Sequence, residues 1–270
     1  MRKRFCYSLF ASLFFLSASY AQLVNIESRR LQTDSTFVLL GNLSLSFNDN
    51  NGSDIFQFGA GLTSQIKPKD SNSIFLFLAN YNLIRIESVD YNNLWFLHFR
   101  YRYKFSELFR VESFVQSQHD EILDVNSRNL LGLGVRLQLA SVEDKDDKAS
   151  ERFKMYLGNA YMYEEEKSDL FDKRFSNHRH SSYLTLRYSA GRGKVSILNV
   201  LYYQPLYKDF TDYRIFEQFK VVVPLSKNEK VNVSCLFDYY FDSITPQERK
   251  QHTSYLKFGI DIELTKSPKN

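Results

Sequence analysis

The residues best suited by type and spacing to carry out a reaction are His180 and Ser182, two positions apart in the run Asn177–Ser182. Alternate residues of a β-strand face the same side, so the imidazole could take the hydroxyl proton and leave a nucleophilic serine oxygen. A third polar group usually orients such a histidine, and we expect Asn159, on a neighbouring segment, to do so. The chemistry would be acyl transfer through a serine ester.

The presence of His180 and Ser182 does not require a hydrolase. Outer-membrane phospholipases carry a His-x-Ser pair on the outside of a barrel strand, but the residues around His180 do not reproduce their motif. Runs rich in His and Ser are usually solvated, so we predict no enzyme and keep a phospholipase-like hydrolase as the alternative. His178 and His180 could hold a divalent metal, but two imidazoles lack a third ligand. We therefore expect neither a metal nor any other cofactor.

A larger set of charged residues recurs at alternate positions of several segments, opposite apolar ones. If these segments close into a barrel, the charged side chains line its interior, where they either pair into a plug or border a narrow solute pore. Basic residues gather between His98 and Arg136, so a conducting form should favour small anions. The expected lumen-lining side chains are His98, Arg100, Arg102, Arg110, Glu112, Arg128, Arg136, Arg187, Lys220, Asp238, Lys257, Asp261 and Glu263.

The elements that must position these residues are segments with a period of two. The last is the clearest, with Leu256, Phe258 and Ile260 on one face and Lys257 and Asp261 on the other. Such a pattern predicts a β-strand with one apolar side. We predict an all-β fold, a closed antiparallel transmembrane β-barrel of about twelve strands. The segments lie near 37–48, 54–65, 73–84, 95–104, 108–118, 128–139, 152–163, 181–191, 194–204, 213–223, 231–242 and 255–264.

The length of these segments separates a membrane barrel from a secreted soluble β-sandwich that binds a ligand, which remains an alternative. Strands in soluble sheets usually have about 5 to 6 residues, whereas a tilted membrane crossing takes about 9 to 11. A closed barrel also pairs every backbone group in lipid.

Glu217 does not fit the pattern of an apolar face towards lipid, because it shares the face of Ile215 and Phe219. We expect a register shift or a bulge there.

The connections between segments are expected to alternate in length. Short ones such as Lys104–Glu107 follow even-numbered segments, and longer polar ones such as Ile86–Asn93 and Glu164–His180 follow odd-numbered segments. Bacterial barrels have short periplasmic turns and longer outer loops. This pattern places both termini in the periplasm and the acids Glu164 to Glu166 in a solvated outer loop.

The first residues have the zones of an export signal, with basic Arg2–Arg4, an apolar stretch to Leu16 and a small-residue exit at Ser19–Ala21. Such a segment is removed on export. We predict a signal peptide over 1–21, a periplasmic lead-in over 22–35, the outer-membrane barrel over 36–264 and a C-terminal tail over 265–270.

Charge and cysteine content exclude other classes. Removal of the signal takes three of the 35 Lys and Arg residues and leaves a near balance with 31 Asp and Glu. A nucleic-acid binder needs a clustered basic surplus, so nucleic acid is excluded as a partner. Cys235 would be the only mature cysteine, which excludes an internal disulfide. The expected partners are outer-membrane lipid and lipopolysaccharide, the barrel-assembly machinery, and small solutes or ions.

The stretch from Arg110 to Leu139 resembles a known family. Its runs Glu112-Ser113-Phe114-Val115-Gln116-Ser117-Gln118-His119-Asp120 and Ser127-Arg128-Asn129-Leu130-Leu131-Gly132-Leu133-Gly134-Val135-Arg136 are similar to the middle of domain-of-unknown-function family 481. The opening Val24–Arg30 is similar to the lead-in of some members, so the resemblance covers about 24–140. It implies a salt-induced-type barrel protein in the outer membrane of a Gram-negative bacterium, with no established activity and no functional residue to carry over.

Overall fold

The computed structural model describes residues 36–50, 53–87, 89–121, 125–143, 151–168, 173–190, 195–225, 231–244 and 251–262. The predicted signal peptide, lead-in and tail lie outside these ranges. The described residues form one antiparallel sheet in which each strand pairs with the next in sequence order, and this confirms the all-β antiparallel prediction. The strands are β1 (Phe37–Asn50), β2 (Ser53–Ile66), β3 (Ser73–Ile86), β4 (Val89–Lys104), β5 (Phe109–Asp120), β6 (Val125–Glu143), β7 (Glu151–Ser168), β8 (Lys173–Ala190), β9 (Val195–Pro205), β10 (Tyr213–Pro224), β11 (Val231–Asp242) and β12 (Gln251–Ile262).

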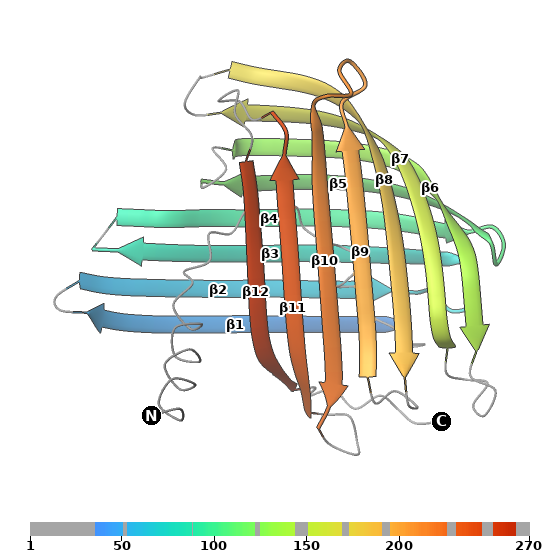
Figure 1. Cartoon of the computed structure of the whole chain (residues 1–270), viewed down its shortest axis with the longest axis horizontal. Helices are drawn as coiled ribbons and strands as arrows, with labels where there is room; N and C mark the ends of the chain where they lie inside the picture. Colours follow the sequence, from blue (N-terminus) through green and yellow to red (C-terminus); the bar gives the residue numbers. More distant parts are fainter. Residues whose placement is uncertain are drawn as a thin grey trace, which may run out of the picture.

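The sheet bends back over itself. Figure 1 shows β9–β12 crossing in front of β1–β4, with the bend passing through the strands between them. Side chains meet across the enclosed space: the Tyr183 hydroxyl of β8 donates to Glu112 Oε2 of β5 over 2.8 Å. In the described ranges the ladders run from β1 to β12, and none of them joins β12 to β1. The closure of the barrel therefore stays a prediction.

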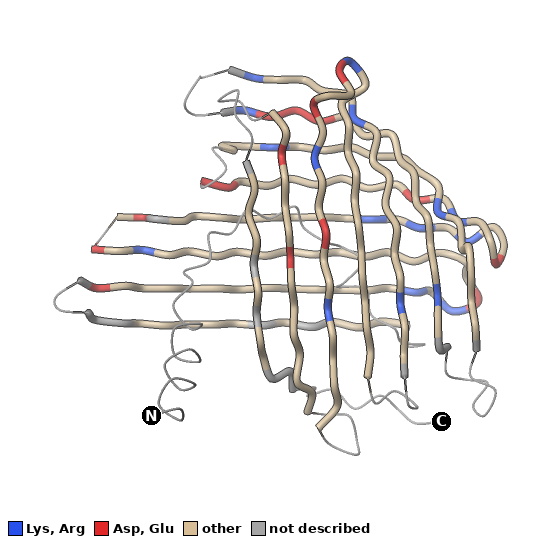
Figure 2. The backbone as a smooth tube through the Cα atoms, viewed as in Figure 1, with Lys and Arg blue, Asp and Glu red and all other residues tan. Residues whose placement is uncertain are grey.

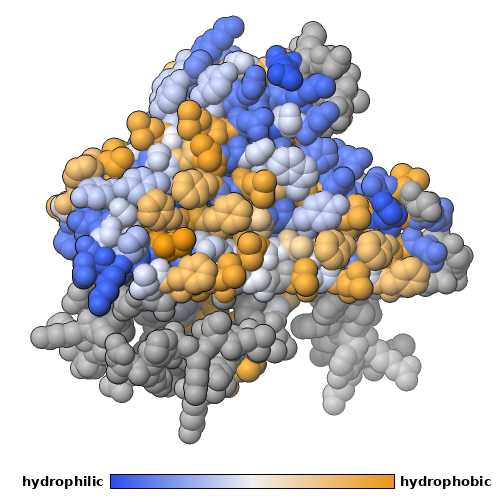
Figure 3. All heavy atoms as spheres, turned by 180° about the vertical axis from the view of Figure 1, so that it is seen from behind, coloured by the Kyte–Doolittle hydropathy of each residue, from blue (hydrophilic) through white to orange (hydrophobic). Residues whose placement is uncertain are grey.

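The buried side of the sheet is largely polar, with two small apolar clusters such as that of Leu76, Leu78 and Phe96, and its outer side is apolar. On β4, Arg100 is 4% exposed, whereas its neighbours Leu97 and Phe99 are 45% and 42% exposed. Exposed Leu, Phe or Val side chains occur likewise on many other strands, and Figure 3 shows broad hydrophobic areas on one outer face of the molecule. A soluble sandwich buries its apolar faces between two sheets. The single sheet with the opposite arrangement contradicts the sandwich alternative.

Charged residues are also unevenly distributed along the length of the strands. In Figure 2 the charged positions of β2–β4 lie towards the ends of these strands, and the stretches between are uncharged. The described ranges include no helix that is both long and apolar enough to cross a bilayer.

The expected contrast in connection lengths is wrong. Residues 51–52 join β1 to β2, while the longer connection 67–72 joins β2 to β3. Most of the predicted outer loop 164–180 is strand, because β7 runs to Ser168 and β8 begins at Lys173. Polar residues there indicated a loop, but Glu164, Glu166 and Arg179 are buried and form ion pairs on the concave side of the sheet. The loop-length argument for periplasmic termini is lost, and their orientation stays a prediction.

The expected bulge at Glu217 is also wrong. The pairing of β10 with β9 and with β11 passes through Glu217 without a shift, opposite Leu201 and Tyr239. Glu217 therefore lies on the outer face, as its position in the alternation implies. There Asn199 Nδ2 of β9 donates to Glu217 Oε1 over 3.1 Å, so a neighbouring amide compensates the carboxylate.

Candidate functional site

The first candidate site is a group of arginines around one carboxylate, Glu112 of β5. Arg102 Nε donates to Glu112 Oε1 over 2.6 Å, and Arg100 Nη1 donates to Oε2 over 3.3 Å. Arg136 Nη1 lies 3.8 Å from Glu112 Oε1, and its guanidinium stacks 4.0 Å from the centre of the Tyr156 ring. We call this group, completed by the Tyr183 hydroxyl, the Glu112 cluster. It joins β4, β5, β6 and β8 on the concave side of the sheet.

A glycine positions the tyrosine of this cluster. Gly158 of β7 pairs with Tyr183 of β8, and a Cβ at residue 158 would lie 2.1 Å from atoms of the Tyr183 ring. A real Cβ cannot approach so closely, so only glycine fits beside the Tyr183 ring in its observed position. The Tyr183 hydroxyl can then reach Glu112.

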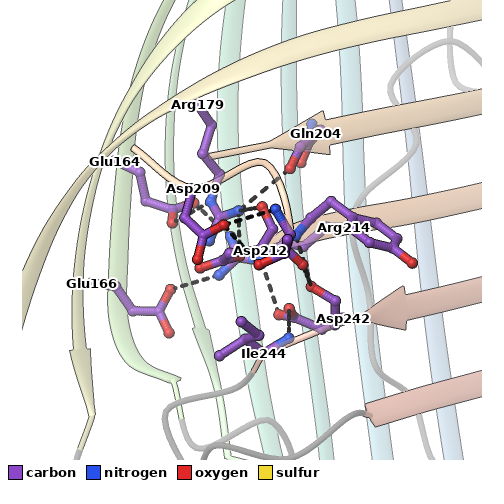
Figure 4. A network of polar contacts seen from close by, with 12 residues as sticks. Glu164, Glu166, Arg179, Gln204, Asp209, Asp212, Arg214, Asp242 and Ile244 are labelled. Carbon is purple, nitrogen blue, oxygen red and sulfur yellow. Dashed lines mark hydrogen bonds and ion pairs between the residues drawn. The ribbon is translucent and has the colours of Figure 1, made fainter. Parts of the chain in front are cut away.

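The second group, shown in Figure 4, lies around Glu164 and Glu166 of β7. Arg214 of β10 spans it: Nη1 lies 2.7 Å from Glu164 Oε2 and Nη2 lies 3.2 Å from Glu166 Oε2. Its Nε donates to Asp242 Oδ2 of β11 over 2.9 Å. Arg128 of β6 adds a 2.7 Å contact from Nη2 to Glu166 Oε2. We call these residues, with Arg179, the Glu164 network.

Arg179 links this network to the β9–β10 connection, residues 206–212. Its Nε lies 3.3 Å from Glu164 Oε1, and its Nη1 lies 2.9 Å from Asp212 Oδ1. Within the connection, the Thr211 hydroxyl and backbone N–H both donate to Asp209 Oδ1. These bonds hold the pKa of Asp209 below its ordinary value, the hydroxyl bond being the larger cause. The connection is thus tied to the charged interior.

The two groups leave little room between them. A cavity of about 50 Å³ lies there, bordered by Arg100, Glu112, Arg128, Glu164 and Arg214 among others. A single water occupies roughly 10–15 Å³ by this measure, so the cavity could hold a few waters. The buried charges also balance: the buried described residues include seven arginines and six carboxylates. Because burial is costly for an unpaired charge, this balance indicates mutual pairing.

The sequence-predicted interior residues fall into three sets. Eight are buried on the concave side: His98, Arg100, Arg102, Arg110, Glu112, Arg128, Arg136 and Asp238. Arg187 and Lys220 are half-buried. The side chains of Lys257 and Asp261, on β12, and the whole of Glu263 lie outside the described part of the chain.

Sequence reasoning missed the centre of the second group, Glu164, Glu166, Arg179, Arg214 and Asp242. Glu164 and Glu166 continue the alternation of Met162 along β7, with both carboxylates buried in the structure. Extending the period-two pattern beyond the apolar zone would have placed them on the inner face. Their high polarity hid this signal, because a run of three glutamates is typical of a solvated loop.

The third candidate site lies on the outer face and includes the residues first singled out for chemistry. His180 Nε2 lies 2.8 Å from Ser182 Oγ, and Ser182 Oγ lies 2.8 Å from Asn159 Oδ1. The structure therefore brings the three predicted residues together. Asn159 contacts the serine instead of the histidine, and the hydroxyl of Tyr207 takes the orienting position, 3.1 Å from His180 Nδ1. We call these four residues the Ser182 group.

The location of this group differs from expectation. His180 lies well inside β8, which begins at Lys173, and not at the outer end of its strand. His178 does not join the group, because its Nδ1 bonds the Tyr161 hydroxyl and its ring stacks on Tyr161. Among the residues that the structure describes, no three His, Cys, Asp or Glu side chains gather in a way that could hold a metal ion.

The family model described as "Protein of unknown function, DUF481" matches residues 43–262. The chain belongs to the DUF481 family. This confirms the resemblance seen in the sequence and extends it, because the match continues from Leu139 through β7–β12. The opening Val24–Arg30 lies outside the match. The DUF481 region thus includes both interior groups and the Ser182 group.

Solved structures similar to this DUF481 protein include two porins and an outer-membrane secretin. "NanC porin structure in rhombohedral crystal form" has 10% identity, covers 85% of this chain and 100% of that chain, and gives a TM-score of 0.46. "Bacterial polysaccharide outer membrane secretin" has 8% identity, with 85% and 91% covered and a TM-score of 0.47. "KdgM porin" has 14% identity, with 84% and 100% covered and a TM-score of 0.41. No curated protein matches the chain.

Proposed function

We propose that this DUF481 protein is an integral outer-membrane β-barrel whose interior is closed by ion pairs, so that its resting role is structural and not that of an open channel. The observation that carries the proposal is the inverted burial: Arg100 is buried and paired while Leu97 and Phe99 of the same strand are exposed.

A lipid environment accounts for the outer face. Keeping a large apolar side chain in water instead of burying it costs roughly 1.5–3 kcal/mol, and such side chains are exposed on strands from β1 to β12. The backbone edges of β1 and β12 also need partners in lipid, which closure of β12 on β1 would supply. The barrel would then contact lipid and lipopolysaccharide, enter the membrane through the assembly machinery, and have both termini in the periplasm.

The paired interior favours a plug over a pore. Arg214 contacts carboxylates on two other strands, so it fastens β10 to β7 and β11. A solute would have to break these contacts, because the cavity between the two groups is only about 50 Å³. If the network opened, the slight excess of arginine over carboxylate would favour small anions.

Planar-bilayer recording of the refolded protein tests the proposal. The wild-type protein should insert and show no steady conductance steps, whereas Arg214→Ala should produce steps because it removes the side chain that spans the network. Arg85→Ala is the matched control, since Arg85 pairs with Asp90 at an exposed strand end, and it should stay silent. Large stable steps in the wild type would overturn the closed interior. Extraction into buffer without detergent would overturn the membrane placement.

A further inference from the structure

If ion pairs close the interior, as proposed above, a ligand would react at the outer surface, where the Ser182 group lies. We propose that Ser182, His180, Asn159 and Tyr207 hydrolyse fatty acyl esters of membrane lipids. This inference rests on the proposed function, because membrane placement brings lipid to this face. The geometry of the group itself is independent of that placement.

The contacts around His180 suit a general base. Its Nδ1 lies 3.1 Å from the Tyr207 hydroxyl, and donation from Nδ1–H to that oxygen leaves a lone pair on Nε2. Nε2 is 2.8 Å from Ser182 Oγ, within the range for proton transfer. Tyr207 is a positioning residue held by its backbone, whose N–H donates to the His178 carbonyl over 2.9 Å.

Asn159 would supply the third group that the reaction needs, a hydrogen-bond donor to the oxyanion. A serine hydroxyl has one proton and donates it to one acceptor at a time, so Ser182 can direct it to Nε2 or to Asn159 Oδ1. When it donates to Nε2, the Asn159 side chain is still beside the nucleophile. A turn of the Asn159 amide about its terminal bond would replace Oδ1, which accepts from Ser182 in the structure, by Nδ2, whose N–H groups would donate to the negative oxygen that develops on an attacked carbonyl.

The reaction needs only water as a second reactant. Ser182 Oγ bonds to the ester carbonyl carbon while its proton passes to His180 Nε2. The bond from that carbon to the lipid alcohol oxygen breaks, and the alcohol leaves with the proton from Nε2. Water then attacks the acyl-serine, gives a proton to Nε2, and releases the fatty acid; the proton returns to Ser182 Oγ.

The surroundings suit an acyl chain. Tyr203 of β9 pairs directly with Ser182, and Tyr161 of β7 pairs with His180. These rings are 41% and 47% exposed, so they present apolar surface beside half-buried polar atoms. The group lies near the middle of β7 and β8 and beside the end of β9 that leads into the β9–β10 connection, which is opposite the end with Phe37 and Ile262. With periplasmic termini, it would face the outer leaflet.

A second outer-face arrangement of the same residue types gives a matched control. Ser117 Oγ of β5 donates to Asn129 Oδ1 of β6 over 2.7 Å, and His119 lies two positions after Ser117. His119 Nδ1 instead bonds the Asn126 carbonyl over 2.7 Å, and its ring stacks on Trp95. Ser117 thus has the amide contact of Ser182, while the histidine on its face is bonded elsewhere.

The first experiment treats detergent-refolded protein with an alkyl fluorophosphonate and maps the modified residue by mass spectrometry. We expect labelling at Ser182, its loss in His180→Gln, and unchanged labelling in Ser117→Ala. Heat-modifiable gel mobility confirms that each variant has folded. Absence of label on folded wild-type protein, or label at Ser117 instead, would overturn the proposal. This arm needs no membrane, so its failure is distinct from failure of the membrane placement.

The second experiment measures fatty acid release from two sources of acyl ester, phosphatidylethanolamine–phosphatidylglycerol vesicles and purified lipopolysaccharide. Ser182→Ala should lower the rate by about 10³-fold or more, and Asn159→Ala by about 10²–10³-fold. Tyr207→Phe should lower kcat more than it changes KM, as expected of a positioning residue. Release from either source that depends on Ser182 supports the proposal and identifies the substrate class. Equal release by wild type and Ser182→Ala from both sources would overturn it.

Discussion

Arg214 of β10 contacts Glu164 of β7 with Nη1 2.7 Å from Oε2, although two strands, β8 and β9, lie between them in the sheet order. Both side chains are almost fully buried. The attraction between them is therefore weakly screened, and either group alone would be a costly buried charge. This contact fastens one part of the curved sheet to another, as a plug must.

Arg214→Ala should lower the free energy of unfolding by about 3–5 kcal/mol, because it leaves Glu164 and Glu166 with less compensation. Urea titration in detergent, followed by gel mobility, measures the change. The double variant Arg214→Ala with Glu164→Gln should recover part of the loss. If the single variant matches the wild type, the network does not fasten the sheet.

Gly158→Ala should destabilise the protein, because the new Cβ would lie 2.1 Å from atoms of the Tyr183 ring. Forcing a methyl group into a packed site typically costs about 1–3 kcal/mol. Gly259→Ala is the matched control, since its Cβ would meet Ser234 Oγ at an ordinary 3.5 Å. Equal unfolding midpoints for the two variants would show that Tyr183 moves aside freely.

Much of the fold was predictable because a period of two needs only local information. The face of His98, Arg100 and Arg102 is inward in the structure, as the alternation on β4 indicated. The pairing of Glu164 with Arg214 was not predictable in this way, because it depends on how the sheet curves and not on either strand alone. The same holds for Tyr207, which reaches His180 from a connection after the next strand.

Asn199 and Glu217, which are hydrogen-bonded on the outer face, allow a test of whether this face contacts lipid. Asn199→Leu should destabilise the folded protein in vesicles, because Glu217 loses the donor at 3.1 Å on a face that we place in lipid. Adding Glu217→Leu should reverse the loss, since both positions would then be apolar. Unfolding in vesicles of defined composition measures both variants. A stable Asn199→Leu protein together with an unstable double variant would place this face outside lipid.

The β9–β10 connection gives a pH-dependent prediction. The Thr211 hydroxyl and N–H lower the pKa of Asp209, so ionised Asp209 stabilises the folded state. A lowered folded-state pKa contributes stability that is complete above the unfolded-state pKa and is lost as the pH falls through the folded-state pKa. Thr211→Val removes the hydroxyl bond, the larger cause, and should raise the pKa of Asp209 towards its ordinary value. NMR titration of the Asp209 carboxyl carbon measures this, with Glu121→Gln as a control in another connection. An unchanged titration in Thr211→Val would show that the hydroxyl bond does not hold the carboxylate.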